Sequence, residues 1–133
     1  MEKKLIINIC ASEDSFGAYA ENCSGINIAG NSVKDIKEQV TGLIELYKEV
    51  NPESEWEEPI KDNWPIEWKY DVQSILNYYS GIISNAALER LTGINQKQLW
   101  NYAHGIKKPR QAAKEKIESA LHKLGQELVD FSF

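Results

Sequence analysis

The stretch 84–110, SNAALERLTGINQKQLWNYAHGIKKPR, predicts two short helices joined at a glycine. Ser84 is a residue type that caps helix N-termini, and Gly93 suits the left-handed turn that ends a helix. Asn95 would then cap a second helix, which Gly105 would end. From their spacing, three small or apolar side chains of the first helix are expected to point inward: Ala87, Leu88 and Leu91.

The second helix of this stretch is polar on the side that its apolar residues leave exposed. Glutamine and asparagine pair with adenine edges, lysine reaches guanine or phosphate, and basic residues in the following loop suit a phosphate backbone. The candidate DNA-binding residues are therefore Asn95, Gln96, Lys97, Trp100, Asn101, His104, Lys107, Lys108 and Arg110. An ordinary helical hairpin with a solvated polar face would show the same periodicity.

The rest of the second half, residues 71–133, is also predicted to be helical. Apolar spacing favours one helix over 72–79 and a longer one over 112–128, with Pro109 near its start. Gly125 within the long helix suggests a kink or a break. Four apolar residues in the C-terminal tail are candidates for a contact with another molecule: Leu128, Val129, Phe131 and Phe133.

The first half is predicted to form a small α+β domain over residues 1–50. Three segments read as strands, over 3–11, 16–23 and 26–29. Ser32 would cap an amphipathic helix that ends near Val50. Three antiparallel strands with one packed helix are the architecture that this order favours, followed by the all-helical second half.

Residues 51–70 differ from both halves in composition. This segment holds three of the four prolines and many of the acidic residues, interleaved with tryptophans. Prolines and acidic residues favour an extended connector, and the two tryptophans of residues 51–65, at 56 and 64, suggest that part of it packs on a domain. Residues 66–70 alternate cleanly and could form a fourth strand that returns to the sheet.

Charge divides the chain of 133 residues unevenly. Residues 1–70 hold seven lysines against fourteen acidic residues, whereas residues 84–116 hold seven basic residues against two acidic ones, within a total net charge of −5. Such a division suggests two partners of opposite charge, although two solvated faces would also produce it. No apolar run approaches the length of a membrane span, and the two cysteines form no metal-binding or disulfide pattern. We therefore expect a cytoplasmic protein with reduced thiols and no membrane partner.

The segment 84–124, with LERLTGINQKQLWNYAHGIKKPR inside it, resembles the phage-repressor-like (Xre/Cro-type) helix-turn-helix domain. The resemblance implies that residues 95–104 form the recognition helix and that Lys107, Lys108 and Arg110 contact phosphates of double-stranded operator DNA. The chain departs from the family where a small residue usually follows Leu88. Glu89 stands there, and either the helix crossing widens or Glu89 takes a partner such as Arg90 or Lys97.

The first half resembles the HicB antitoxin family. The resemblance lies in the acidic turn Glu13-Asp14, the Gly-Ala-Tyr of the second strand, Cys-Ser-Gly at 23–25, and Ser32 with its helix. It implies a reduced ribonuclease H-like fold without catalytic carboxylates, in an antitoxin that neutralises a small, basic, RNA-cleaving HicA-like toxin and represses its own operon. An acidic surface suits a basic RNA-binding partner, so Glu13, Asp14 and Glu21 are the candidate toxin-binding residues.

Two other interpretations stay open. The first is a ribonuclease, which would need several carboxylates that converge on a metal ion. The sequence does not offer such a set, so we expect no catalytic residues, no metal site and no cofactor. A solitary or ligand-sensing Xre-type regulator would share the DNA-binding half and would need an apolar pocket in the first half.

A helix-turn-helix repressor usually dimerises, and the open sheet edge, the exposed tryptophans or the C-terminal tail could supply the contact. We favour a homodimer or higher oligomer joined through the tail or C-terminal helices.

Overall fold

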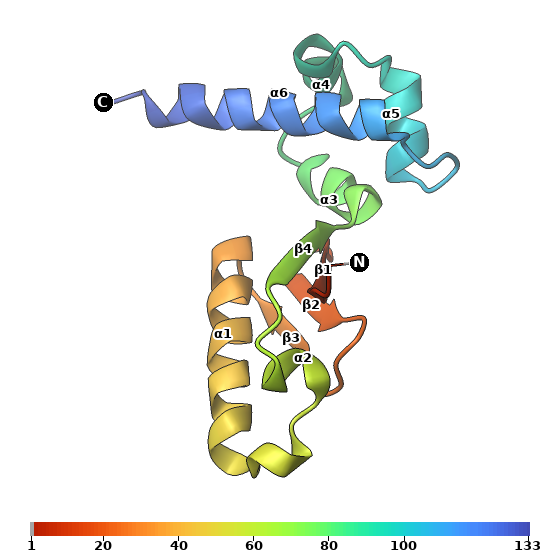
Figure 1. Ribbon diagram of the computed structural model, residues 1–133. Helices are drawn as coiled ribbons and strands as arrows, with labels where there is room; N and C mark the ends of the chain where they lie inside the picture. The colour runs from red at the N-terminus through yellow and green to blue at the C-terminus, as the bar shows by residue number, and fades with distance from the viewer. Residues whose placement is uncertain (1) are drawn as a thin grey trace. The chain divides into compact units, whose positions relative to one another are not determined.

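The computed structural model describes residues 2–133, so residue 1 of the expected first domain lies outside it. The chain has an α+β fold and divides into two compact units, one ending at Asp71 and the other covering Val72–Phe133. Figure 1 shows the order of elements along the chain. Each unit is described by itself below.

The first unit contains a mixed four-stranded sheet in the order β3-β2-β1-β4. Its strands are β1 (Leu5–Ala11), β2 (Phe16–Ala20), β3 (Asn27–Gly30) and β4 (Ile66–Tyr70). The first three pair antiparallel, but β4 runs parallel to β1, with Leu5 opposite Ile66 and Ile9 opposite Tyr70. The three predicted antiparallel strands are confirmed, and the returning strand, whose direction the sequence left open, makes the sheet mixed rather than antiparallel throughout. The chain leaves the sheet at β3 and returns beside β1 after a long helical crossover, the kind of connection that parallel strands need.

Helix α1 (Val33–Val50) covers one face of this sheet (Figure 1). It has the predicted bounds, and the Ser32 side chain accepts a hydrogen bond from the backbone N–H of Asp35 at 3.0 Å. Ile36 and Val40 of the helix are fully buried, as are Ile7 and Ile9 of β1. These apolar side chains form the centre of the first unit's core, which drives the association of helix and sheet.

The connector is folded rather than extended, contrary to expectation. It forms a short 3₁₀ helix η1 (Glu53–Glu55) and a single turn α2 (Glu58–Lys61), in which Pro59 and Ile60 are buried. The Trp56 indole donates to the carbonyl of Asn51 at 2.9 Å, just beyond the end of α1. Burial of two apolar side chains and these polar contacts keep the segment within the first unit.

A carboxylate, Glu57, joins the connector to the loop between β2 and β3. It accepts hydrogen bonds from the Ser24 hydroxyl at 2.7 Å and the Ser24 backbone N–H at 3.1 Å. The second strand ends at Ala20 rather than at residue 23, and the loop that follows places Cys23 in the core. Burial and the neighbouring Glu57 charge raise the pKa of Cys23 to about 11, so this free thiol is uncharged at neutral pH.

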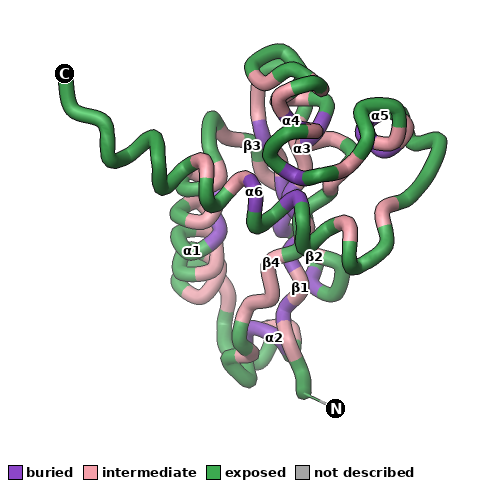
Figure 2. Tube along the Cα trace, turned by 90° about the horizontal axis from the view of Figure 1, so that it is seen from above, coloured by how far each residue is buried: buried purple, intermediate pink, exposed green. Residues whose placement is uncertain are grey.

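Four helices make up the second unit: α3 (Val72–Tyr79), α4 (Asn85–Thr92), α5 (Gln96–Ala103) and α6 (Gln111–Val129). They pack around a small core that consists of Leu76, Leu88, Leu99, Tyr102, Ala103 and Ile117. Figure 2 colours the buried residues of the chain purple. Two expectations are corrected. Leu91 is 38% exposed rather than buried, and α6 continues through Gly125 without a break.

No helix of residues 2–133 combines the length and the apolar character needed to cross a membrane.

Glu57→Gln is expected to destabilise the first unit at neutral pH. The Ser24 hydroxyl, which donates to the carboxylate, is the main cause that holds the pKa of Glu57 below its usual range. Because its folded-state pKa is lowered, the ionised Glu57 adds to the free energy of unfolding. This contribution is fully present above the unfolded-state pKa, and it is lost as the pH falls through the folded-state pKa. We expect urea unfolding at pH 7 to show a loss of about 1–2 kcal/mol. The difference from the unsubstituted chain should shrink below about pH 4.5.

The matched control is Glu58→Gln. Glu58 is the neighbouring glutamate, and its only ion pair in the described structure is an exposed contact with Lys3 at 3.2 Å. Exposed ion pairs contribute little, so this variant should unfold like the unsubstituted chain. Equal losses for the two variants would show that the Glu57–Ser24 contacts carry no special stability.

Candidate nucleic-acid interface

The turn between α4 and α5 is held by hydrogen bonds on both sides of Gly93. Gly93 has φ 75°, in the left-handed region, and its N–H donates to the carbonyl of Glu89 at 2.8 Å. The Thr92 hydroxyl donates to the carbonyl of Leu88 at 2.7 Å and accepts from the N–H of Ile94 at 3.0 Å. These bonds satisfy polar groups that the end of α4 would otherwise leave open, and so fix the direction of α5.

One face of α5 is buried and the opposite face is exposed. Leu99, Tyr102 and Ala103 pack into the core, with exposed fractions of 1%, 7% and 6%. Lys97 lies on the opposite face together with Asn101, four residues further along the helix. Lys97 is exposed and Asn101 is half-buried, so a lysine and an amide point away from the core next to each other.

Two of the predicted contact residues have partners within the chain. The side-chain oxygen of Asn95 accepts a hydrogen bond from the N–H of Lys97 at 2.7 Å, which makes Asn95 the cap of α5. The amide nitrogen of Gln96 donates to the carboxylate of Glu89 at 3.2 Å. Glu89 therefore takes Gln96 as its partner, rather than Arg90 or Lys97 as expected, because Gln96 lies across the turn from it.

Trp100 and His104 form an aromatic pair on the exposed side of α5. Their rings stack with centroids 3.8 Å apart at an interplanar angle of 20°. The His104 ring nitrogen Nδ1 lies 2.9 Å from the carbonyl of Trp100, which orients the imidazole, while 44% of Trp100 stays exposed. The pair provides a flat aromatic surface beside Lys97 and Asn101.

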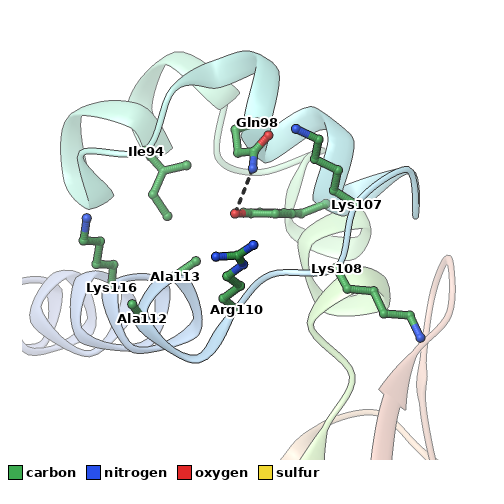
Figure 3. Close-up of a pocket in the computed structure, with 9 residues that line it drawn as sticks. Ile94, Gln98, Lys107, Lys108, Arg110, Ala112, Ala113 and Lys116 are labelled. Atoms are coloured by element: carbon green, nitrogen blue, oxygen red, sulfur yellow. Dashed lines mark hydrogen bonds between the residues drawn. The ribbon is translucent and has the colours of Figure 1, made fainter.

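A basic hollow lies between α5 and the start of α6 (Figure 3). It has a volume of about 600 Å³, and four basic residues line it: Lys107, Lys108, Arg110 and Lys116. Arg110 points toward the hydrogen bond that Gln98 donates to the Tyr102 hydroxyl at 3.1 Å, whereas Lys108 points away. In the described part of the chain, none of these four cations has an acidic partner within 4.0 Å.

The first turn of α6 adds to the positive character of this hollow. Arg110 caps the helix without a side-chain hydrogen bond to its first N–H groups, and Ala112 and Ala113 line the hollow. Free N–H groups at a helix N-terminus attract anions, and small side chains leave room for a close approach. The hollow is therefore suited to a phosphate group.

Sequence reasoning did not identify Gln98 or Lys116 as part of this site. Gln98 lies four residues before Tyr102, a spacing that could have indicated the contact between them. Lys116 is 18 positions further along the chain than Gln98, and only the packing of α6 brings it to the hollow.

The three acidic residues predicted to bind a toxin are not brought together. Glu13 and Asp14 lie exposed in the turn between β1 and β2. Glu21 follows the other end of β2, where it accepts a hydrogen bond from the Asn8 amide at 2.8 Å. Since a strand rises roughly 3.3 Å per residue, the length of β2, about 15 Å, separates them. No group of three or more metal-ligating side chains occurs in residues 2–133.

Two glycine substitutions are expected to change the stability of the second unit in opposite directions. Gly93→Ala should lower the free energy of unfolding by about 1–2 kcal/mol, because a Cβ is strained in the left-handed conformation although no atom lies within 4 Å of it. Gly125→Ala should raise it by about 0.5–1 kcal/mol, because Gly125 lies inside α6 with open space around it. Thermal and urea unfolding measure both. Stabilisation by Gly93→Ala would contradict the turn geometry.

No model of a known protein family, no curated protein and no solved structure matches this chain.

Proposed function

We propose that α4 and α5 form a helix-turn-helix and that α5 is the recognition helix of a DNA-binding repressor. The observation that carries this proposal is that Lys97 and Asn101 lie on the exposed face of α5, beside a basic hollow. An α-helix fits the major groove of DNA, where lysine and asparagine read base edges. Basic residues next to the inserted helix hold the phosphate backbone and set the orientation of the protein.

The contacts divide between reading sequence and binding the backbone. Lys97 and Asn101 would contact bases, and the exposed surface of Trp100 would contact the thymine methyl group. Gln96 keeps its side-chain oxygen available, because only its nitrogen is donated to Glu89. Lys107, Arg110 and the N-terminus of α6 would hold one phosphate at the hollow, and Lys108 would reach the next.

We further propose that the chain is an antitoxin of the HicA/HicB type. In this proposal the first unit is the reduced ribonuclease H-like domain of that family, and it binds and neutralises a small basic RNA-cleaving toxin. The excess of acidic residues in residues 1–70 supports it, since an acidic surface attracts a basic partner. Because Glu13 and Glu21 lie at opposite ends of β2, a toxin that contacts both would extend along the hairpin of β1 and β2.

A ligand-sensing regulator is the second candidate, and the apolar hollow in the first unit is the feature that bears on it. This hollow lies between α1 and α2 and has a volume of about 160 Å³. Its lining includes Ile26, Leu43, Tyr47 and Ile60. Sites for small molecules usually occupy about 300–1,000 Å³, so the size of this hollow favours a protein partner.

Replacing both Lys97 and Asn101 with alanine is expected to reduce operator binding to the level of non-specific DNA. Each base contact contributes about 1–3 kcal/mol, so the two together correspond to a loss on the order of 100-fold in affinity or more. Fluorescence anisotropy with DNA from upstream of the gene measures the affinity at fixed salt concentration. Binding of the toxin should be unchanged, because the substitutions lie in the second unit.

The matched control replaces Lys123 and Gln126 with alanine. These residues are also an exposed lysine and an exposed amide of the second unit, but they lie in the C-terminal half of α6, away from the basic hollow. The control should bind the operator normally. If the α5 variant also binds normally, α5 is not the recognition helix.

Co-expression tests the antitoxin proposal directly. The tagged chain is produced together with the short reading frame beside its gene, and the purified complex is weighed. A stable complex with a small basic protein that is toxic alone is the expected result, and combined reversal of Glu13, Asp14 and Glu21 to lysine should weaken it. A chain that binds upstream DNA but captures no partner would instead support the ligand-sensing regulator.

A further inference from the structure

Strand β4 is an edge of the sheet, and one row of its backbone groups has no partner. At the two ends of the ladder with β1, Leu5 N–H donates to the carbonyl of Pro65 and Asp71 N–H donates to the carbonyl of Ile9, both at 2.9 Å. Parallel pairing uses alternate residues of a strand, so Glu67 and Lys69 also face β1. The N–H and C=O groups of Ile66, Trp68 and Tyr70 therefore point away from the sheet.

The opposite edge, β3, is partly closed by α1. The Gln39 side chain donates to the carbonyl of Ala29 at 2.9 Å, and Asp35 accepts from the N–H of Asn31 at 3.1 Å. A bare edge strand invites pairing with another chain, and natural proteins usually block such edges. In the described structure no side chain makes a hydrogen bond to the outward backbone groups of β4, so this edge is open.

The side chains of β4 are sorted between the two faces of the sheet. Ile66, Trp68 and Tyr70 share the face that carries α1, where Lys37 Nζ lies 5.3 Å from the Trp68 ring centroid. Glu67 and Lys69 are on the other face. Neither forms an ion pair within residues 2–133, and Lys69 is exposed.

We propose that β4 pairs antiparallel with β4 of a second copy of this chain, around a two-fold axis at Trp68. In this register Trp68 lies opposite Trp68, and Ile66 lies opposite Tyr70. Each of these residues has its backbone groups turned outward, so every pair can exchange two hydrogen bonds. Glu67 then lies opposite Lys69 of the other chain, and the two-fold axis generates a second, identical pair.

Charge selects this register over its neighbours. A shift of the second strand by two residues keeps the outward groups paired, but it places Glu67 opposite Glu67 in one direction and Lys69 opposite Lys69 in the other. Like charges directly opposite each other destabilise a strand pair, whereas opposite charges stabilise it. A shift by one residue places the outward N–H and C=O groups of one β4 strand opposite residues of the other β4 strand whose N–H and C=O groups are already bonded to β1. The sequence IEWKY is therefore self-complementary in one antiparallel register only.

This interface goes beyond the proposed function and does not depend on it. Two chains joined at β4 would hold two α5 helices in one assembly, which suits a repressor because one recognition helix reads only a half-site. The apolar tail at the end of α6 and just beyond it also has exposed side chains, Leu128 and Phe131 among them, but no charge pattern there identifies its occupant.

The test compares three full-length chains by sedimentation equilibrium: the unsubstituted chain, Lys69→Glu and the double variant Glu67→Lys/Lys69→Glu. The unsubstituted chain should reach twice its 15.1 kDa mass as its concentration rises. Lys69→Glu places two pairs of like charges at the interface and should raise the dimer dissociation constant about 30-fold. The double variant restores opposite charges and should recover most of the affinity. Loss of dimer in the double variant as well would overturn the proposal.

A second pair of variants tests the backbone pairing. Tyr70→Pro removes one outward N–H that β1 does not use and should prevent dimerisation, whereas Tyr70→Ala keeps that N–H and should weaken it less. Hydrogen exchange locates the contact: the N–H groups of Trp68 and Tyr70 should become protected as the dimer forms. Two results would refute pairing at β4. One is a chain that stays monomeric at all concentrations. The other is a dimer in which these N–H groups still exchange freely, as they would in a dimer joined through α6.

Discussion

The surface that α5 offers depends on the turn at Gly93. The left-handed backbone there, held by the Thr92 hydroxyl on both sides, sets the direction in which α5 leaves α4. Once that direction is fixed, Leu99 and Tyr102 must enter the core, because burial of large side chains is the main source of stability in a unit this small. The exposed position of Lys97 is a consequence of that packing, so the proposed recognition face is built into the fold and needs no rearrangement to form.

Elements governed by local chemistry could be predicted from the sequence, and elements governed by distant contacts could not. Ser32 and the apolar spacing after it were enough to place α1 at Val33–Val50. The alternation at 66–70 predicted a strand, but its neighbour and direction depend on the path of residues 51–65. That path is fixed by the burial of Ile60 and by the hydrogen bonds of Glu57 to Ser24, which lies 33 positions earlier. Composition alone made this segment look extended.

The same distinction applies to the candidate site. Helical periodicity was sufficient to separate Lys97 and Asn101 from Leu99, because all three lie on one helix. The basic hollow was missed because it forms where α5 meets the first turns of α6, and Lys116 reaches it only through that packing. Periodicity also misplaced Leu91, since a helix of two turns in a small unit buries only a narrow stripe, which Leu88 already occupies.

The two surfaces proposed for partners separate affinity from specificity in different ways. On β4 the backbone groups would accept any extended strand, so Glu67 and Lys69 must determine which strand pairs and in which register. On α5 the side chains read bases, and the nearby cations supply attraction that is independent of sequence. A chain with a net charge of −5 can still bind an anion in this way, because charges farther away than the Debye length, about 8–10 Å, are largely screened. Within residues 84–116, seven basic side chains outnumber two acidic ones, so the charge of this segment itself favours a phosphate at the hollow.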